Sequence, residues 1–240
     1  MNKLRDYYRS VRRRVVRATR RPAVGQVNLG DLDRLTPISR NWGFDRGRPI
    51  DRLYIERFIA AHAGDIRGNV LEVSNNDYTL RFGGDRVTQS DILHPVEGNA
   101  RATVIADLAV PEPSLEERFD CIICTQTLQL IYDFQSAIRQ LRCWLKPGGV
   151  ALVSVPGISQ ISREDMQQTG DYWRFTGAAM RRAFTEEFGE GAVEIDVLGN
   201  VLAATAFLQG IAAEEFDEAE LLEADPQFQM LTTIRAARQS

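Results

Sequence analysis

Polar side chains able to bind a ligand follow four short apolar runs of the sequence. They are Glu72, Asp91, Asp107 and Thr125, in the order of the runs. If the runs form parallel strands, their carboxyl ends meet at one edge of a sheet, where open α/β sheets bind their ligands. The recurrence of polar residues at successive strand ends therefore predicts a ligand site at this edge.

Other chemistries find less support in the sequence. Cys121 and Cys124 form a C-x-x-C within an apolar run. Residues three apart in a strand point to opposite faces, so we expect the two thiols to stay apart. His62 and His94 lack neighbours with metal-ligand spacing, which predicts no structural metal. No P-loop and no G-x-S-x-G nucleophile motif occurs.

The elements that must position these residues alternate along the chain. Apolar runs predict seven strands at residues 69–73, 86–90, 102–106, 119–124, 150–155, 193–198 and 230–236. Helical spacing predicts helices between several of them, with Asp51, Asp133, Thr176 and Asn200 as N-caps. This alternation favours an α/β, doubly wound, mostly parallel sheet with helices on both faces.

Charge is distributed unevenly over the 240 residues, whose net charge is −4. Residues 1–21 hold nine basic side chains and one acid, a net of +8, so the remainder carries −12. This arm is interpreted as a basic amphipathic helix for an anionic membrane surface or as a solvated tail, and a nucleic-acid contact or a mitochondrial presequence are further alternatives. We expect an arm and lead-in at 1–50 and one domain at 51–240. With no secretory signal or membrane span, the sequence predicts a cytoplasmic protein, with peripheral contact at the inner membrane face as an option.

An ordered set of motifs resembles the class I S-adenosylmethionine-dependent methyltransferases, in particular type 11-like members, over about residues 50–240. The motifs are Val70-Leu71-Glu72-Val73-Ser74, Ser90-Asp91, Ala106-Asp107-Leu108, residues 119–125 and Leu145-Lys146-Pro147-Gly148-Gly149. Residues 43–47, 51–54 and 171–176 look like bacterial members associated with glycan or surface-polysaccharide assembly. The resemblance implies a Rossmann-like, seven-stranded sheet with an antiparallel last strand.

The resemblance also implies S-adenosylmethionine as the cofactor. Asp91 corresponds to the acid that binds the ribose hydroxyls, and Glu72 to the acid that organises the methionine portion. Asp107 and Leu108 match the adenine contacts. The full set of implied cofactor-binding residues is Glu72, Ser74, Asn76, Tyr78, Asp91, Ile92, Asp107, Leu108, Thr125 and Gln126. The alternative for the acids is a structural role, with backbone donors satisfying the carboxylates.

The turn after the first strand departs from the family pattern. Residues 74–78 read Ser-Asn-Asn-Asp-Tyr, where the family has glycines. Asparagine and aspartate tolerate left-handed backbone, so the turn can still form. The spacing leaves only short helices after the first two strands. A dinucleotide normally needs a G-x-G-x-x-G turn for its pyrophosphate, and none is present, so an NAD-dependent enzyme is disfavoured.

The catalytic and acceptor residues are less well defined. Gln129 stands where related enzymes often carry a histidine, which leaves His94, Asp171 and Tyr172 as candidates for a base. Candidate acceptor-binding residues are Arg46, Arg52, Tyr54, Tyr172 and Arg174. The arginines suit an anionic acceptor, the cofactor carboxylate, or ordinary surface ion pairs.

The predicted function is methyl transfer to a small molecule or glycan, at oxygen by analogy with the family. The alternative is an inactive methyltransferase-fold protein that serves binding or assembly. A nucleic-acid acceptor is disfavoured by the net charge of −12 on the body of the chain.

Overall fold

The structure is a computed structural model that describes residues 21–239. The chain divides into two units, residues 1–36 and 37–240. The described part of the first unit contains one short 3-10 turn at Gly30–Leu32. The predicted basic helix of residues 1–21 lies outside the described residues, except for Arg21.

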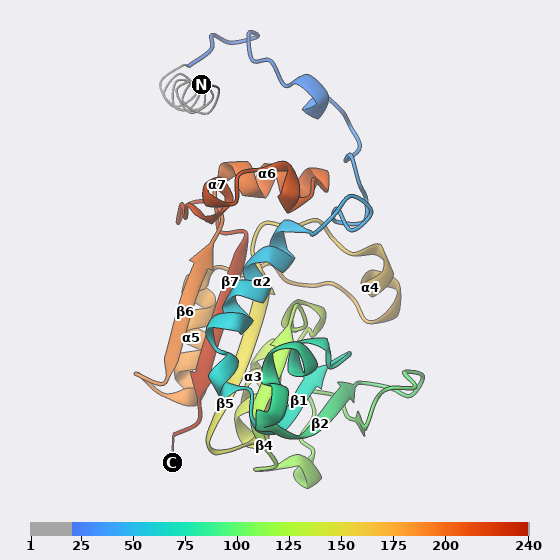
Figure 1. Ribbon diagram of the computed structural model, residues 1–240, viewed down its shortest axis with the longest axis vertical. Coiled ribbons are helices and arrows are strands. Elements are labelled where there is room, and N and C mark those ends of the chain that lie inside the picture. Colours follow the sequence, from blue (N-terminus) through green and yellow to red (C-terminus); the bar gives the residue numbers. More distant parts are fainter. Residues whose placement is uncertain (1–20, 240) are drawn as a thin grey trace. The chain divides into compact units, whose positions relative to one another are not determined.

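The second unit is built on one seven-stranded sheet (Figure 1). Its strands are β1 (Gly68–Val73), β2 (Val87–His94), β3 (Val104–Ile105), β4 (Phe119–Thr125), β5 (Leu145–Pro156), β6 (Val193–Leu198) and β7 (Leu231–Ala237). Their order is β3-β2-β1-β4-β5-β7-β6. The first five are parallel, and β7 runs antiparallel to both of its neighbours. This confirms the predicted Rossmann-like topology and its antiparallel last strand.

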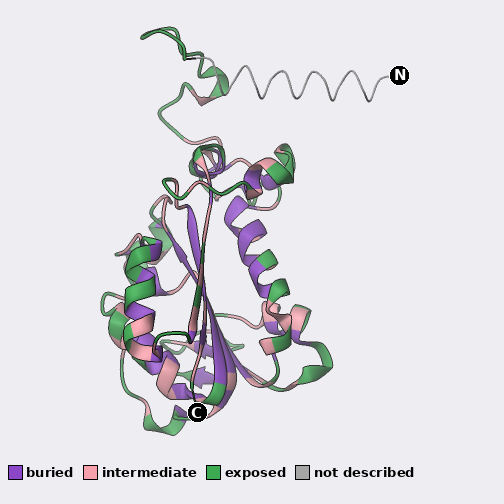
Figure 2. Cartoon of the chain, turned by 90° about the vertical axis from the view of Figure 1, so that its left-hand side faces the viewer, coloured by how far each residue is buried: buried purple, intermediate pink, exposed green. Residues whose placement is uncertain are grey.

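Helices cover both faces of the sheet, and two apolar cores fill the spaces between the layers (Figure 2). One face packs against α3 (Phe134–Trp144) and α5 (Gly177–Phe188), and the other against α2 (Ile50–Ala61) and α6 (Val201–Gln209). Two short helices, α4 (Arg163–Gln168) and α7 (Glu218–Leu222), are the other α-helices of residues 21–239. Cys121 and Cys124 lie in different cores, as the alternation of a strand requires.

Three of the four predicted N-caps are confirmed. The side chains of Asp133, Thr176 and Asn200 each accept a hydrogen bond from a backbone N–H in the first turn of their helix. The prediction for Asp51 is wrong, because α2 begins one residue earlier, after Pro49. Asp51 therefore sits inside the first turn, and its side chain is not used as the N-cap.

Two connections are shortened, as the sequence predicts. Between β1 and β2 the chain forms only a π turn at Thr79–Gly83 and a 3-10 turn at Gly84–Arg86. Strand β2 is longer than predicted because Ile92 and Leu93 are buried and pair with Glu72 and Val73 of β1. Asp91 consequently lies within the strand, and His94 is the residue at its carboxyl end.

Candidate active site

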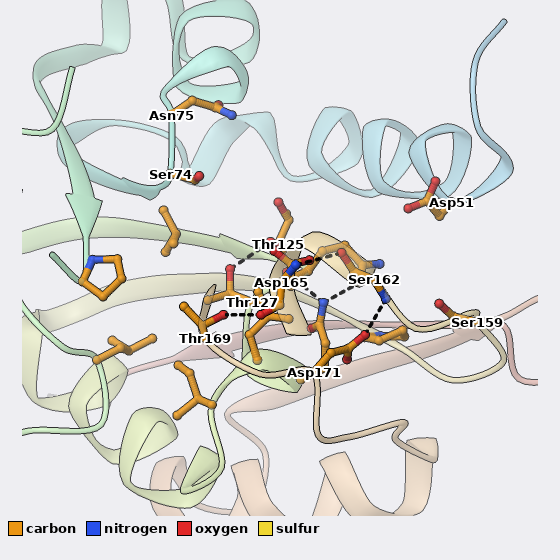
Figure 3. Close-up of a pocket in the computed structure, with 18 of the residues that line it drawn as sticks. Asp51, Ser74, Asn75, Thr125, Thr127, Ser159, Ser162, Asp165, Thr169 and Asp171 are labelled. Carbon is orange, nitrogen blue, oxygen red and sulfur yellow. Dashed lines mark hydrogen bonds between the residues drawn. The ribbon is translucent and has the colours of Figure 1, made fainter. Parts of the chain in front are cut away.

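A cavity of about 1050 Å³ opens at the carboxyl ends of β1, β2, β4 and β5 (Figure 3). Small-molecule sites are typically about 300–1,000 Å³, so this volume accommodates a cofactor and an acceptor side by side. Further lining comes from residues before and within α2, from the segment after β3, and from the segment after β5, which contains α4. Phe207 of α6 and Met230 and Leu231 at the start of β7 also contribute.

Most of the residues predicted to bind cofactor border this cavity. Those that line it are Glu72, Ser74, Tyr78, Asp107, Leu108, Thr125 and Gln126. The other three, Asn76, Asp91 and Ile92, do not line it. Most of the predicted strand-end residues therefore converge on one cavity. The exceptions lie in strand β2 or in the turn after β1, which differ from the prediction.

Asp91 is engaged within the sheet rather than at the cavity. Its carboxylate is 5% exposed and accepts hydrogen bonds from Thr103 Oγ1 at 2.8 Å and Gln89 Nε2 at 2.9 Å. It also forms an ion pair with Arg118, with the nitrogen and oxygen 3.0 Å apart. Because β2 continues past it, the structure does not bring Asp91 to the cavity lining. His94 lines the cavity there instead.

Glu72 holds the turn that follows β1. One carboxylate oxygen accepts from the backbone N–H of Tyr78 at 3.2 Å, and the other accepts from Thr79 N and Oγ1 at 2.8 and 2.7 Å. Burial raises the pKa of Glu72, while these hydrogen bonds oppose the shift. The carboxylate is therefore committed to the backbone, and it shapes the cavity by fixing the turn.

The left-handed residue of this turn is Ser74, with φ of 75°. The turn therefore forms without glycine, as the sequence allows, but its left-handed residue is a serine and not one of the asparagines or the aspartate. Asn76 instead ties the turn to its surroundings, because its amide nitrogen donates to Ser90 Oγ and its oxygen accepts from Arg101. These contacts explain why Asn76 lies outside the cavity lining.

The segment after β5 is anchored by a buried ion pair. The carboxylate of Asp171 accepts from two nitrogens of Arg174, at 2.6 and 2.9 Å, and from the backbone N–H of Ser162 at 2.9 Å. Although burial opposes it, this set of donors holds the pKa of Asp171 below its usual value. A carboxylate so engaged is a poor proton acceptor, and the geometry gives Asp171 and Arg174 a supporting role in the cavity wall.

The other two candidates for a base also line the cavity. Nδ1 of His94 lies 2.6 Å from the carbonyl oxygen of Val96, which fixes the ring. Tyr172 is half exposed, and its ring meets Tyr132 edge to face with centroids 5.4 Å apart. Trp173 packs away from the cavity against Phe134 and Phe175, as an aromatic plug.

Two predicted acceptor-binding residues have other roles. Arg46 forms a two-pronged ion pair with Glu215, at 3.0 and 2.8 Å. Tyr54 is buried in α2, and its hydroxyl donates to the carbonyl oxygen of Leu221. Arg52 does line the cavity.

Sequence reasoning missed a group of polar cavity residues. Asp51 comes from the first turn of α2, and the rest follow β5, namely Ser159, Gln160, Ser162, Asp165, Gln168 and Thr169. The sequence contained a signal for the residues after β5, because polar residues directly after a parallel strand are expected at the ligand-binding edge of the sheet.

Among residues 21–239, no group of three or more His, Cys, Asp or Glu side chains could hold a metal ion. In the same part of the chain no helix is long and apolar enough to cross a membrane.

The sheet order, the shortened connections and the cavity at the carboxyl strand ends define a Rossmann-like ligand-binding domain. Residues 40–189 match the sequence family described as a methyltransferase domain, so the chain belongs to that family. It is an S-adenosylmethionine-dependent methyltransferase.

Solved structures agree at the level of the fold. One is an S-adenosylmethionine-dependent methyltransferase from Archaeoglobus fulgidus, with 12% identity, 81% of this chain and 96% of that chain covered, and a TM-score of 0.52. Another is the cyclase SpnF, with 16% identity, 81% and 83% coverage, and a TM-score of 0.51. A search of curated proteins found no match.

Proposed function

We propose that the protein transfers the methyl group of S-adenosylmethionine to a hydroxyl oxygen of a small molecule or glycan. The observation that supports this proposal is that different segments of the chain line the two halves of one cavity. The turns after β1, β3 and β4 line one half, and the polar segment after β5 lines the other, beside Tyr132 and Tyr172. Hydroxyl and amide groups beside aromatic rings suit a ligand rich in hydroxyls.

The first half suits S-adenosylmethionine better than a dinucleotide. A pyrophosphate is normally held by free backbone N–H groups at the N-terminus of a full helix, whereas only short turns, at Thr79–Gly83 and Gly84–Arg86, follow β1. We assign cofactor binding to Ser74, Asp107, Leu108 and Thr125, a proposal supported by their position in the cavity lining. When bound, S-adenosylmethionine supplies an electrophilic methyl group. The chain's contribution is to align the acceptor with that group and to exclude water.

The second half contains a candidate proton acceptor for a hydroxyl group. Asp165 in α4 lines the cavity, and no ion pair within 4.0 Å engages its side chain among the described residues. Asp171, by contrast, is paired with Arg174. Asp165 is therefore the acid of this segment that remains available to an acceptor.

Transfer of labelled methyl groups tests the proposal. The protein is incubated with methyl-labelled S-adenosylmethionine and a panel of glycans and small polyols, and NMR locates the methyl group in the product. We expect O-methylation, reduced at least tenfold by Asp165→Asn with cofactor affinity retained. Asp196→Asn, an exposed acid of β6, is the matched control and should leave transfer unchanged. Label on nitrogen or carbon, or cofactor binding with no methylated hydroxyl compound, would contradict the acceptor proposal.

We also propose that the protein works in polysaccharide biosynthesis in the cytoplasm, with peripheral contact at the inner membrane face. The net charge of +8 on residues 1–21 supports attraction to anionic lipids. Co-sedimentation with phosphatidylserine vesicles should depend on these residues and weaken with salt. Equal binding to neutral vesicles would contradict the electrostatic attachment.

A further inference from the structure

Three arginines line the cavity, and they differ in their partners. Arg81 forms an ion pair with Glu56 at 3.0 Å, and Arg174 with Asp171 at 2.6 Å. Arg52 has no carboxylate within 4.0 Å among the described residues. Arg52 thus faces the cavity without a direct ion pair, and the charges of Asp51 and Glu56 act on it only from beyond 4.0 Å.

Arg52 is held in place by polar and aromatic contacts. One terminal nitrogen donates to Tyr78 Oη at 3.3 Å, and the guanidinium lies 6.0 Å from the centre of the Phe44 ring. Tyr78 belongs to the turn after β1, whose backbone Glu72 fixes. The guanidinium is therefore connected to the half of the cavity that we assign to the cofactor.

Asp51, the residue before Arg52, presents a negative charge to the same cavity. Asp51 is 9% exposed and lines the cavity, and Figure 3 shows its side chain on the cavity side of α2. Its Oδ1 accepts from the backbone N–H of Arg52 at 2.8 Å, and no cation lies within 4.0 Å of it among the described residues. Burial raises the pKa of Asp51, and the charge of Arg52 opposes that shift. A buried carboxylate without a directly paired cation is costly, and a ligand ammonium would add to the stabilisation that Arg52 gives it from a distance.

We propose that Asp51 and Arg52 together clamp the amino-acid end of the cofactor, Asp51 binding its ammonium and Arg52 its carboxylate. This inference rests on the proposed cofactor site. An α-amino acid carries both charges on one carbon, and Asp51 and Arg52 present one group of each opposite charge to the same cavity. Guanidinium also binds carboxylate in a two-pronged geometry.

The clamp would compensate for the missing glycines in the turn after β1. Residues 74–78 lack glycines that would let the backbone approach the methionine part, and Glu72 is committed to the backbone of the turn. The chain therefore needs another source of charge complementarity for the cofactor, and α2 provides it beside the turn, where Arg52 contacts Tyr78.

Calorimetric titration with three ligands separates the two contacts. S-adenosylmethionine has both charged groups, decarboxylated S-adenosylmethionine keeps only the amine, and 5′-methylthioadenosine has neither. A hydrogen-bonded ion pair is worth about 1.5–3 kcal/mol, or roughly 10- to 150-fold in affinity. Arg52→Gln should lose affinity on this scale only for S-adenosylmethionine. Asp51→Asn should lose it for both amine-bearing ligands.

A matched control comes from the same helix. Arg57, which pairs with Glu218 on an exposed face, should tolerate Arg57→Gln with unchanged affinities. Arg52→Lys keeps the charge but not the two-pronged geometry, and should show an intermediate loss. It also serves if Arg52→Gln does not fold, as judged by circular dichroism.

The outcomes distinguish the clamp from the cofactor site itself. Equal weakening of all three ligands by Arg52→Gln, or no weakening at all, overturns the clamp while the site stands. If the wild-type protein binds none of the adenosyl ligands, the proposed cofactor site fails as well. Unchanged cofactor affinity with loss of an anionic acceptor would assign Arg52 to the acceptor half.

Discussion

The ion pair between Arg174 and Asp171 is expected to hold the cavity wall, and Arg174→Met tests it. The side chain of Asp171 is 3% exposed and that of Arg174 is 25% exposed. Removing one partner of a buried pair costs about 3–5 kcal/mol, because the other charge is left uncompensated. Since Arg174 is partly exposed, we expect about 3 kcal/mol, the lower end of this range.

Thermal and urea denaturation measure this loss. For a chain of this size, about 3 kcal/mol corresponds to a fall in Tm of roughly 6–12 °C. The matched control is Arg182→Met, which removes an exposed helical pair with Glu186 and should leave the Tm unchanged.

The pH dependence of the free energy of unfolding shows whether the ion pair causes the loss of stability. The folded pKa of Asp171 is depressed, so the pair stabilises the wild-type protein above the usual pKa of aspartate and is lost as the pH falls through the lower folded value. In Arg174→Met the buried acid protonates readily, so the deficit should shrink as the pH falls from 7 towards about 4. A deficit below 1 kcal/mol, or one independent of pH, would refute the reasoning.

Two further predictions concern groups away from the cavity. Tyr54→Phe removes the hydrogen bond to the Leu221 carbonyl and should cost about 1–2 kcal/mol in urea denaturation, with cofactor affinity unchanged in calorimetry. A loss of cofactor affinity in Tyr54→Phe would instead indicate that Tyr54 contributes to the cofactor site. Burial raises the pKa of Cys124 to about 12 and also raises that of Cys121. Iodoacetamide should therefore label only the half-buried Cys143 in the native protein, as mass spectrometry can show. Native labelling of Cys121 would contradict its burial.

Much of the fold was predictable because its signals are local. Apolar runs located all seven strands, and side-chain caps located three helix starts. Strand ends were less certain, because they depend on pairing partners distant in sequence. The end of strand β2 was placed four residues too early, and that error moved Asp91 to a strand end where it does not lie.

The site was predictable only where it follows strands. Thr125 and Asp107 reach the cavity because they follow strands of the parallel sheet. Asp51 was predicted to be a helix N-cap. Its place in the cavity lining was missed, because a sequence does not show which helix will border a cavity. The commitment of Glu72 to the turn backbone likewise depends on a hydrogen-bond pattern that only the folded chain displays.

The most direct test of the central claim is a crystal structure of the protein with S-adenosylhomocysteine. We predict the ligand in the cavity at the ends of β1, β2 and β4, with its adenine beside Asp107 and Leu108 and its amino-acid end beside Arg52. A ligand bound elsewhere, or adenine and amino acid in reversed positions, would contradict the assignment of the two halves of the cavity.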